Sequence, residues 1–206
     1  TDTLRMYEMF LGPLEQSKPW NTAGISGVHN FLKKFWKLYF DSDNLIVDNS
    51  KPDKNNLKTL HKCIKKVSSD IESFSFNTAV STLMITVNEL TAQKCKSKDV
   101  LEPLVIVLSP FAPHICEEIW EKIGNKKSIV YSIFPEYSEA YIQDSTKIYP
   151  VSINGKLKYK IELPAYLSKD EIEAAVLSDE NFTKKLEGNK PKRVIVIPGK
   201  IINFVV

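Results

Sequence analysis

Residues 100–124 read VLEPLVIVLSPFAPHICEEIWEKIG, and this stretch decides the fold class. Residues 100–108 are apolar on nearly every side of a helix, which is typical of a helix surrounded by other elements. Pro110 ends that helix, because proline lacks a backbone donor and disfavours the helical conformation of the residue before it. Pro113 can begin a second helix, and Gly124 suits the left-handed turn that follows one. The stretch predicts a central helix, a tight corner and a second helix.

Three more helical patterns precede this stretch. Apolar residues recur at steps of three and four over residues 24–40, 57–71 and 76–90, which is the spacing of a helix with one buried face. Short polar residues at 73–77 favour a turn, so the second and third of these helices should form an antiparallel pair. Residues 41–56 lack periodicity and predict an exposed connection. We therefore expect an antiparallel helical bundle.

The first helix of this bundle should carry a basic stripe. Spacings of three, four and seven place four polar residues on one side of it: Asn30, Lys33, Lys34 and Lys37. The ordinary interpretation is a solvated helix face, because lysines are mostly exposed in any protein. The alternative is an edge that contacts phosphates.

The end of the chain predicts a small α+β domain with two hairpins and a covering helix. An acid-rich helix is expected over residues 168–187, with Ile172, Val176 and Leu177 inward. Residues 194–197 and 201–206 should form a hairpin around a turn at residues 198–200. Three basic residues lie at this end: Lys192, Arg193 and Lys200.

The other hairpin is expected over residues 147–163, with its turn at Asn154-Gly155. A two-residue turn would set Val151 beside Lys158 and mix apolar and charged side chains on each face. A three-residue loop with a bulge at Gly155 instead aligns Val151 with Leu157. In that register three basic residues share the outer face: Lys156, Lys158 and Lys160.

Charge is distributed unevenly along the chain. The 206 residues carry a net charge of +3, which by itself is too small to indicate nucleic-acid binding. Residues 146–206 hold 11 Lys and Arg against 7 Asp and Glu, whereas residues 1–145 hold 17 against 18. The basic surplus therefore belongs to the end of the chain.

Composition excludes several classes of protein. A hydrophobic content of 43% is ordinary for a globular chain, and no apolar run is long enough to span a membrane. Cys63, Cys95 and Cys116 lack the paired spacing of zinc or redox motifs, so we expect buried, reduced thiols in a cytoplasmic protein. The chain begins at Thr1 within an expected helix, which predicts a piece of a longer protein.

Several strings resemble the class I leucyl-tRNA synthetases in order and spacing. They are TLRMYEMFLGPL at residues 3–14, KPW at 18–20, SPFAPH at 109–114, VSINGKLKYK at 151–160 and the PGK turn at 198–200. The string at 109–114 is shared among related synthetases. The strings at the end of the chain are those that single out the leucine family.

The resemblance implies a mainly α fold, namely an anticodon-binding bundle of the class I type over residues 21–145. Residues 1–20 would be the end of the stem-contact region, and residues 146–206 the α+β tRNA-binding domain. The implied partner is tRNA(Leu), which the basic residues above would contact: Asn30, Lys33, Lys34, Lys37, Lys156, Lys158, Lys160, Lys192, Arg193 and Lys200.

The chemistry of that family would lie elsewhere. The family's two adenylate-binding signatures have no match in the 206 residues, so no catalytic residue, metal ligand or cofactor is assigned to this chain. ATP with Mg²⁺ would be used in the full-length enzyme, by catalytic and editing domains upstream in the same polypeptide. We expect a cytoplasmic monomer without a membrane partner.

Two other interpretations stay open from the residues alone. One is the equivalent region of another class I synthetase, such as the valine, isoleucine or methionine enzyme, although the hairpins at the end of the chain argue against it. The other is a helical protein-interaction module that binds no nucleic acid, in which the lysines are simply solvated.

Overall fold

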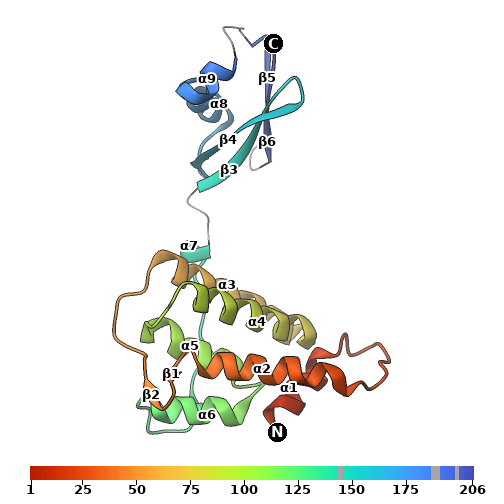
Figure 1. The fold of residues 1–206 in the computed structure, drawn as a ribbon, viewed down its shortest axis with the longest axis vertical. Helices are drawn as coiled ribbons and strands as arrows, with labels where there is room; N and C mark the ends of the chain where they lie inside the picture. Colours follow the sequence, from red (N-terminus) through yellow and green to blue (C-terminus); the bar gives the residue numbers. More distant parts are fainter. Residues whose placement is uncertain (143–145, 187–190, 198–199) are drawn as a thin grey trace. The chain divides into compact units, whose positions relative to one another are not determined.

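The computed structural model describes residues 1–142, 146–186, 191–197 and 200–206, and the chain divides into two compact units. The helical unit is Thr1–Ile142 and the sheet unit is Gln143–Val206 (Figure 1). Each has its own hydrophobic core. The expected fold class, a mainly α bundle followed by a small α+β unit, is confirmed.

The helical unit is built from seven α-helices among its described residues. They are α1 (Asp2–Phe10), α2 (Ile25–Trp36), α3 (Lys54–Glu72), α4 (Phe76–Ala92), α5 (Lys98–Leu108), α6 (Pro113–Lys122) and the short α7 (Glu139–Ile142). Single 3-10 turns lie at Thr22–Gly24 and Ile129–Tyr131. The antiparallel pair predicted from the sequence is α3 and α4, which turn at residues 73–75.

Helix α5 is central, as its composition predicts. Six of its side chains are fully buried: Val100, Leu101, Leu104, Val105, Val107 and Leu108. The hydroxyl of Tyr39 donates to the Leu101 carbonyl over 2.9 Å, and burial raises the pKa of that phenol well above its usual range. Pro113 begins α6 and Gly124 follows it with a φ of +104°, so the corner is formed as expected.

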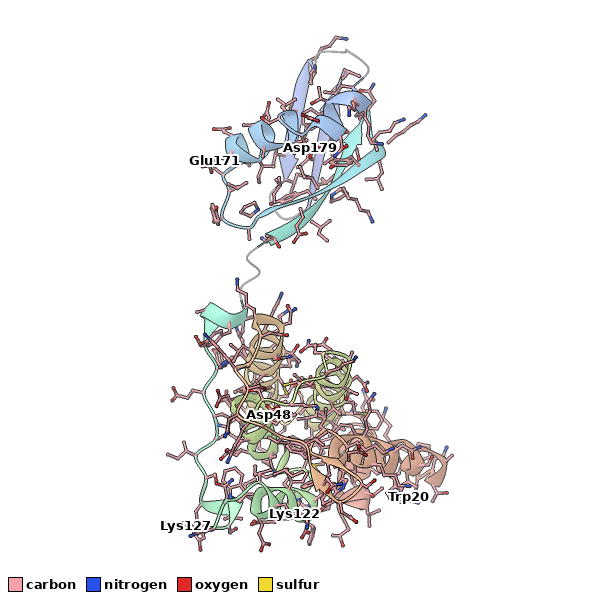
Figure 2. All side chains as sticks on the ribbon, turned by 60° about the vertical axis from the view of Figure 1, so that its left-hand side comes forward. Trp20, Asp48, Lys122, Lys127, Glu171 and Asp179 are labelled. Carbon is pink, nitrogen blue, oxygen red and sulfur yellow. The ribbon has the colours of Figure 1, made fainter. Side chains whose placement is uncertain are left out.

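Residues 41–56 are more ordered than their composition predicts. Two-residue strands β1 (Phe40–Asp41) and β2 (Asn44–Leu45) pair antiparallel, and Asp48 bridges to Ser97 at the start of α5 (Figure 2). The Ser97 hydroxyl also donates to the Ser50 carbonyl over 2.7 Å. The expected exposed connection is confirmed, since most of residues 41–56 are exposed. The strand pair within it was not predicted, because strands this short show no alternation that a sequence pattern could reveal.

The sheet unit contains one four-stranded mixed sheet. Its strands are β3 (Thr146–Ile153), β4 (Lys156–Pro164), β5 (Arg193–Ile197) and β6 (Ile201–Val205), in the order β4-β3-β6-β5. The two hairpins are antiparallel and β3 runs parallel to β6. Helices α8 (Lys169–Leu177) and α9 (Glu180–Lys185) lie on one side of the sheet (Figure 1). The turn residues 198–199 lie outside the described residues.

The expected single helix over residues 168–187 is wrong, because α8 ends at Leu177 and α9 begins after Asp179. The carboxylate of Asp179, which is labelled in Figure 2, accepts from the backbone N–H of Phe182 over 2.9 Å, as a helix N-cap does. The break turns Leu177 outward, where it is 39% exposed, and buries Phe182 and Leu186 instead. Residue 187 lies outside the described residues.

The turn of the β3–β4 hairpin also differs from the expectation. Ile153 pairs with Lys156, so that Asn154 and Gly155 form a two-residue turn. Both have positive φ, 48° and 78°, which is the turn that Asn-Gly favours between antiparallel strands. The predicted three-residue loop is wrong.

A β-bulge further along the hairpin restores the apolar alternation. Ser152 pairs with Leu157 but Val151 pairs with Tyr159, so Lys158 is the extra residue. One extra residue exchanges the faces of all side chains that follow it. A two-residue turn without a bulge would have set Val151 beside Lys158. With the bulge, Val151 pairs with Tyr159 instead, and Val151 and Tyr149 are both buried.

Candidate nucleic-acid interface

Three of the four residues predicted for the basic stripe of α2 are exposed in the structure. Its inner face is buried through Val28, Phe31, Leu32 and Phe35. Asn30, Lys33 and Lys37 are exposed, whereas Lys34 is half-buried. The Lys34 ammonium donates to the Asn88 side chain of α4 over 2.7 Å, so this lysine is held against the bundle. Lys33 and Lys37 are the members of the stripe whose exposure suits contact with a large anion.

A hollow of about 460 Å³ lies beside this stripe, between α1, α2 and α6. Its lining includes Lys33, His29, His114 and Asp2. The Asp2 carboxylate already accepts from the backbone N–H groups of His114 and Ile115, over 3.3 and 2.7 Å, and lies 2.7 Å from Nδ1 of His114. Asp2 therefore caps α6 from a distant part of the chain, and His114 is one of the residues whose backbone N–H it accepts.

The lysines of β4 do not share one face, which corrects the sequence prediction. Directly paired residues lie on the same face of a sheet. Lys156 pairs with Ile153, which packs against the core, whereas Lys160 pairs with Pro150, three residues earlier on β3 and thus on the opposite face. Lys158 is the bulge residue between them. The bulge is the physical reason why Lys156 and Lys160 lie on opposite faces of the sheet. That each of these lysines contacts RNA stays a prediction.

The remaining basic residues lie around β5. Arg193 is the first residue of that strand and pairs with Val205, and the preceding Lys192 donates its backbone N–H to the Val205 carbonyl over 2.7 Å. Lys200 lies directly before β6. All three side chains are exposed, so they are available to a phosphate backbone.

An apolar surface on the sheet was not anticipated from the sequence. Four of its large side chains are between 38% and 65% exposed: Ile148, Leu157, Ile195 and Ile197. The strand pairing places all four on the face opposite α8 and α9, which we call the open face. A solvated sheet face is normally polar, and exposed apolar side chains on one can contribute to a binding surface. Ser152 and Asn203 lie between Leu157 and Ile195 in one row of the sheet. The signal in the sequence was the run VIVI at residues 194–197, which is apolar at every position.

The described cysteines are poorly suited to nucleophilic chemistry. Burial raises the pKa of the Cys63 thiol to about 11 and that of Cys116 well above its ordinary value, so neither is a nucleophile at neutral pH. Cys63, Cys95 and Cys116 are unbonded and buried, as predicted. Within the described ranges no cluster of His, Cys, Asp and Glu could hold a metal ion, and no described helix could cross a membrane.

Comparison with known proteins gives a consistent result. A family model for the anticodon-binding domain of tRNA ligase matches residues 53–174. Leucine–tRNA ligases of Christiangramia forsetii and Flavobacterium psychrophilum are 61% and 60% identical to the chain over 204 residues, which is 99% of this chain and 21% of each relative. The chain therefore spans about a fifth of the length of these relatives.

A solved structure resembles the chain over almost all of its length. It is the ternary complex of Agrobacterium radiobacter LeuRS with tRNA and LeuAMS, with a TM-score of 0.73 and 26% identity over 99% of this chain and 28% of that one. The family model itself covers more than half of the chain, from the cap of α3 into α8. The chain thus belongs to the family of anticodon-binding domains of tRNA ligases.

Proposed function

We propose that the chain is the tRNA-holding part of a leucine–tRNA ligase. The observation that carries this proposal is the 61% identity to a leucine–tRNA ligase along 99% of the chain. A valine, isoleucine or methionine synthetase would share the bundle with this chain. The similarity to leucine enzymes extends beyond the bundle and through the sheet unit. ATP with Mg²⁺ and the catalytic and editing residues would belong to other domains of that enzyme, in the cytoplasm.

This chain would contribute to the reaction by positioning the tRNA. Lysines such as Lys33 and Lys37 suit the phosphate backbone, because an ammonium group is a point charge without the geometry that reads a base edge. Contacts of this kind orient an RNA without selecting its sequence. Holding tRNA(Leu) in place makes its acceptor end available to a distant active site, which removes part of the entropic barrier to the reaction.

The sheet unit would use a different kind of contact. Its open face combines isoleucines with Arg193 and Lys160, so that an apolar surface has basic residues at its edges. The outer corner of a tRNA offers flat base surfaces beside phosphates, and such a surface can accept both kinds of side chain. We propose that the helical unit lies against the tRNA body and the open face contacts the corner.

The role of the α2 stripe can be measured through the dependence of binding on salt. If about five phosphates are neutralised, the logarithm of affinity should fall with the logarithm of salt at a slope of about −4. Replacing Lys33 and Lys37 together with Ala should make the slope shallower by about 2, because each lost phosphate contact removes about 0.9. Fluorescence anisotropy with labelled tRNA(Leu) at several salt concentrations gives both slopes.

The matched control replaces Lys126 and Lys127, which are exposed and follow α6. They line one hollow together with Glu118 and Glu121, and Lys127 is labelled in Figure 2. It removes the same charge and should leave the slope near that of the unmodified chain. Equal slopes for all three proteins would remove the stripe from the interface. No binding of tRNA by the unmodified chain would instead favour the protein-interaction module.

A further inference from the structure

The last residues of the helical unit are fastened to one side of α3. Residues 137–142, which we call the latch, include α7. The backbone N–H of Ser138 donates to Nδ1 of His61 over 3.1 Å. The ring of Tyr141 stacks on the His61 ring with centroids 4.6 Å apart and planes 16° apart. The latch is therefore bound to α3 through the side chain of His61.

A second side chain of α3 holds the other part of the latch. Lys65 forms an ion pair with Glu139, and its ammonium lies 5.3 Å from the centre of the Tyr137 ring. His61 and Lys65 are four residues apart, hence neighbours on one side of the helix. The two residues thus make all four of these contacts with the latch.

The latch is not held by a hydrophobic core. No residue of α7 is buried, and Tyr137 and Tyr141 are 42% and 43% exposed. By contrast, Phe134, three residues before the latch, packs against the core of the helical unit. A segment with little buried apolar surface opens more readily than the elements around it. The latch can therefore open while the bundle stays folded.

We propose that the latch sets the length of chain that joins the two units. When it is closed, the described helical unit extends to Ile142 and residues 143–145 lead to β3, which begins at Thr146. When it is open, the last residue held by the core is Phe134, and residues 135–145 join the units. The joining segment then grows from three residues to eleven.

The consequence for binding rests on the proposed function, in which one tRNA is held by both units. The effective concentration of a second binding module falls with about the −3/2 power of the length of a long linker. Provided that the shorter segment already spans the two bound sites, an increase from three to eleven residues weakens the combined affinity by up to about sevenfold. A closed latch would strengthen the hold on tRNA without touching it.

The test uses the full chain with Glu139 and Tyr141 both replaced by Ala. This variant removes one ion pair and one ring stack from the latch, and it also removes a negative charge. Electrostatic attraction alone predicts equal or tighter binding of a polyanion to it. We expect weaker binding of labelled tRNA(Leu), by about two- to sevenfold, together with faster amide exchange at residues 137–142.

The matched control is Glu136→Ala, an exposed glutamate directly before the latch that removes the same charge. Weaker binding and faster latch exchange in the double variant, relative to this control, support the proposal. Unchanged exchange would overturn it, and so would faster exchange with the affinity of the control. Failure of the unmodified chain to bind tRNA would refute the proposed function first, so the two failures are distinguishable.

The latch should also respond to pH. His61 accepts the Ser138 N–H through Nδ1, which only the neutral ring can do, and partial burial lowers the pKa of this imidazole from 6.5. Because the closed state has the lower pKa, its stability is complete above 6.5 and is lost as the pH falls through the lowered value. The charged and titratable groups on the latch side are Glu139, Tyr137 and Tyr141 of the latch and Lys65 of α3. Lys58 and Lys62 of α3 line a hollow with Glu89 of α4.

We expect the protection of the Ser138 amide, corrected for the intrinsic exchange rate, to decrease between about pH 7.5 and about pH 5. His61→Phe keeps a ring for Tyr141 to stack on but offers no acceptor. Its protection at Ser138 should be low at both pH values. A decrease of the same size in this variant would show that His61 does not cause the response.

Discussion

Replacing Phe182 with alanine is expected to unfold the sheet unit while the helical unit stays folded. The Phe182 side chain is fully buried, with its ring centre 4.6 Å from that of Phe204 and 6.4 Å from that of Tyr159. A buried Phe→Ala substitution costs about 3–5 kcal/mol. A domain of about 60 residues has a total stability of roughly 3–9 kcal/mol, so the loss is a large part of what holds this unit together.

The three tryptophans allow the two units to be observed separately. Trp20, Trp36 and Trp120 all lie in the helical unit. Tryptophan fluorescence during urea unfolding should therefore be nearly the same in Phe182→Ala and in the unmodified chain. Amide exchange of β3 and β4, by contrast, should approach that of an unfolded chain.

Leu177→Ala is the matched control for this substitution. Leu177 lies on α8 in the same unit but is 39% exposed, so its truncation should cost less than about 1 kcal/mol. Equal destabilisation by both variants would contradict the placement of the break between α8 and α9. A shift of the tryptophan transition by Phe182→Ala would show that the two units unfold together.

The parts of the fold that the sequence predicts well are those where burial is repeated along one element. In α5 every turn carries apolar residues, so the pattern itself predicts that the helix is central. The break at Ser178-Asp179 was harder, because an Asp within an acid-rich helical pattern resembles its neighbours. Its capping role becomes visible only when Phe182 is seen to require a buried position.

The parts that sequence reasoning missed depend on pairing between distant residues. The bulge at Lys158 is determined by the partner strand, since Val151 and Tyr159 must face the core together. The open face follows from the order of four strands, which no local pattern contains. For the candidate interface, the exposure of Lys33 and Lys37 was predictable from helical spacing, but the separation of Lys156 from Lys160 was not.

Asp2 also contacts residues far away in the sequence, namely His114 and Ile115. Removing its side chain should lower the stability of the helical unit substantially. Asp2 is buried in the first turn of α1 and caps a helix that begins 111 residues later, at Pro113. In Asp2→Ala, the N–H groups of His114 and Ile115 lose their charged acceptor. Hydrogen bonds to a charged group and the favourable helix dipole together suggest a loss of about 2–4 kcal/mol.

Urea unfolding followed by tryptophan fluorescence measures this loss, because Trp120 lies on α6 itself. Asp2→Asn keeps an oxygen acceptor without the charge, so it should lose about half as much stability as Asp2→Ala. Asp99→Ala is the control for position, since it removes an exposed acid from the first turn of α5 and should cost about 0.3–1 kcal/mol. If Asp2→Ala cost no more than Asp99→Ala, the carboxylate would stabilise only the helix that carries it. A larger cost would show that the Asp2 side chain also stabilises the packing of α1 against α6.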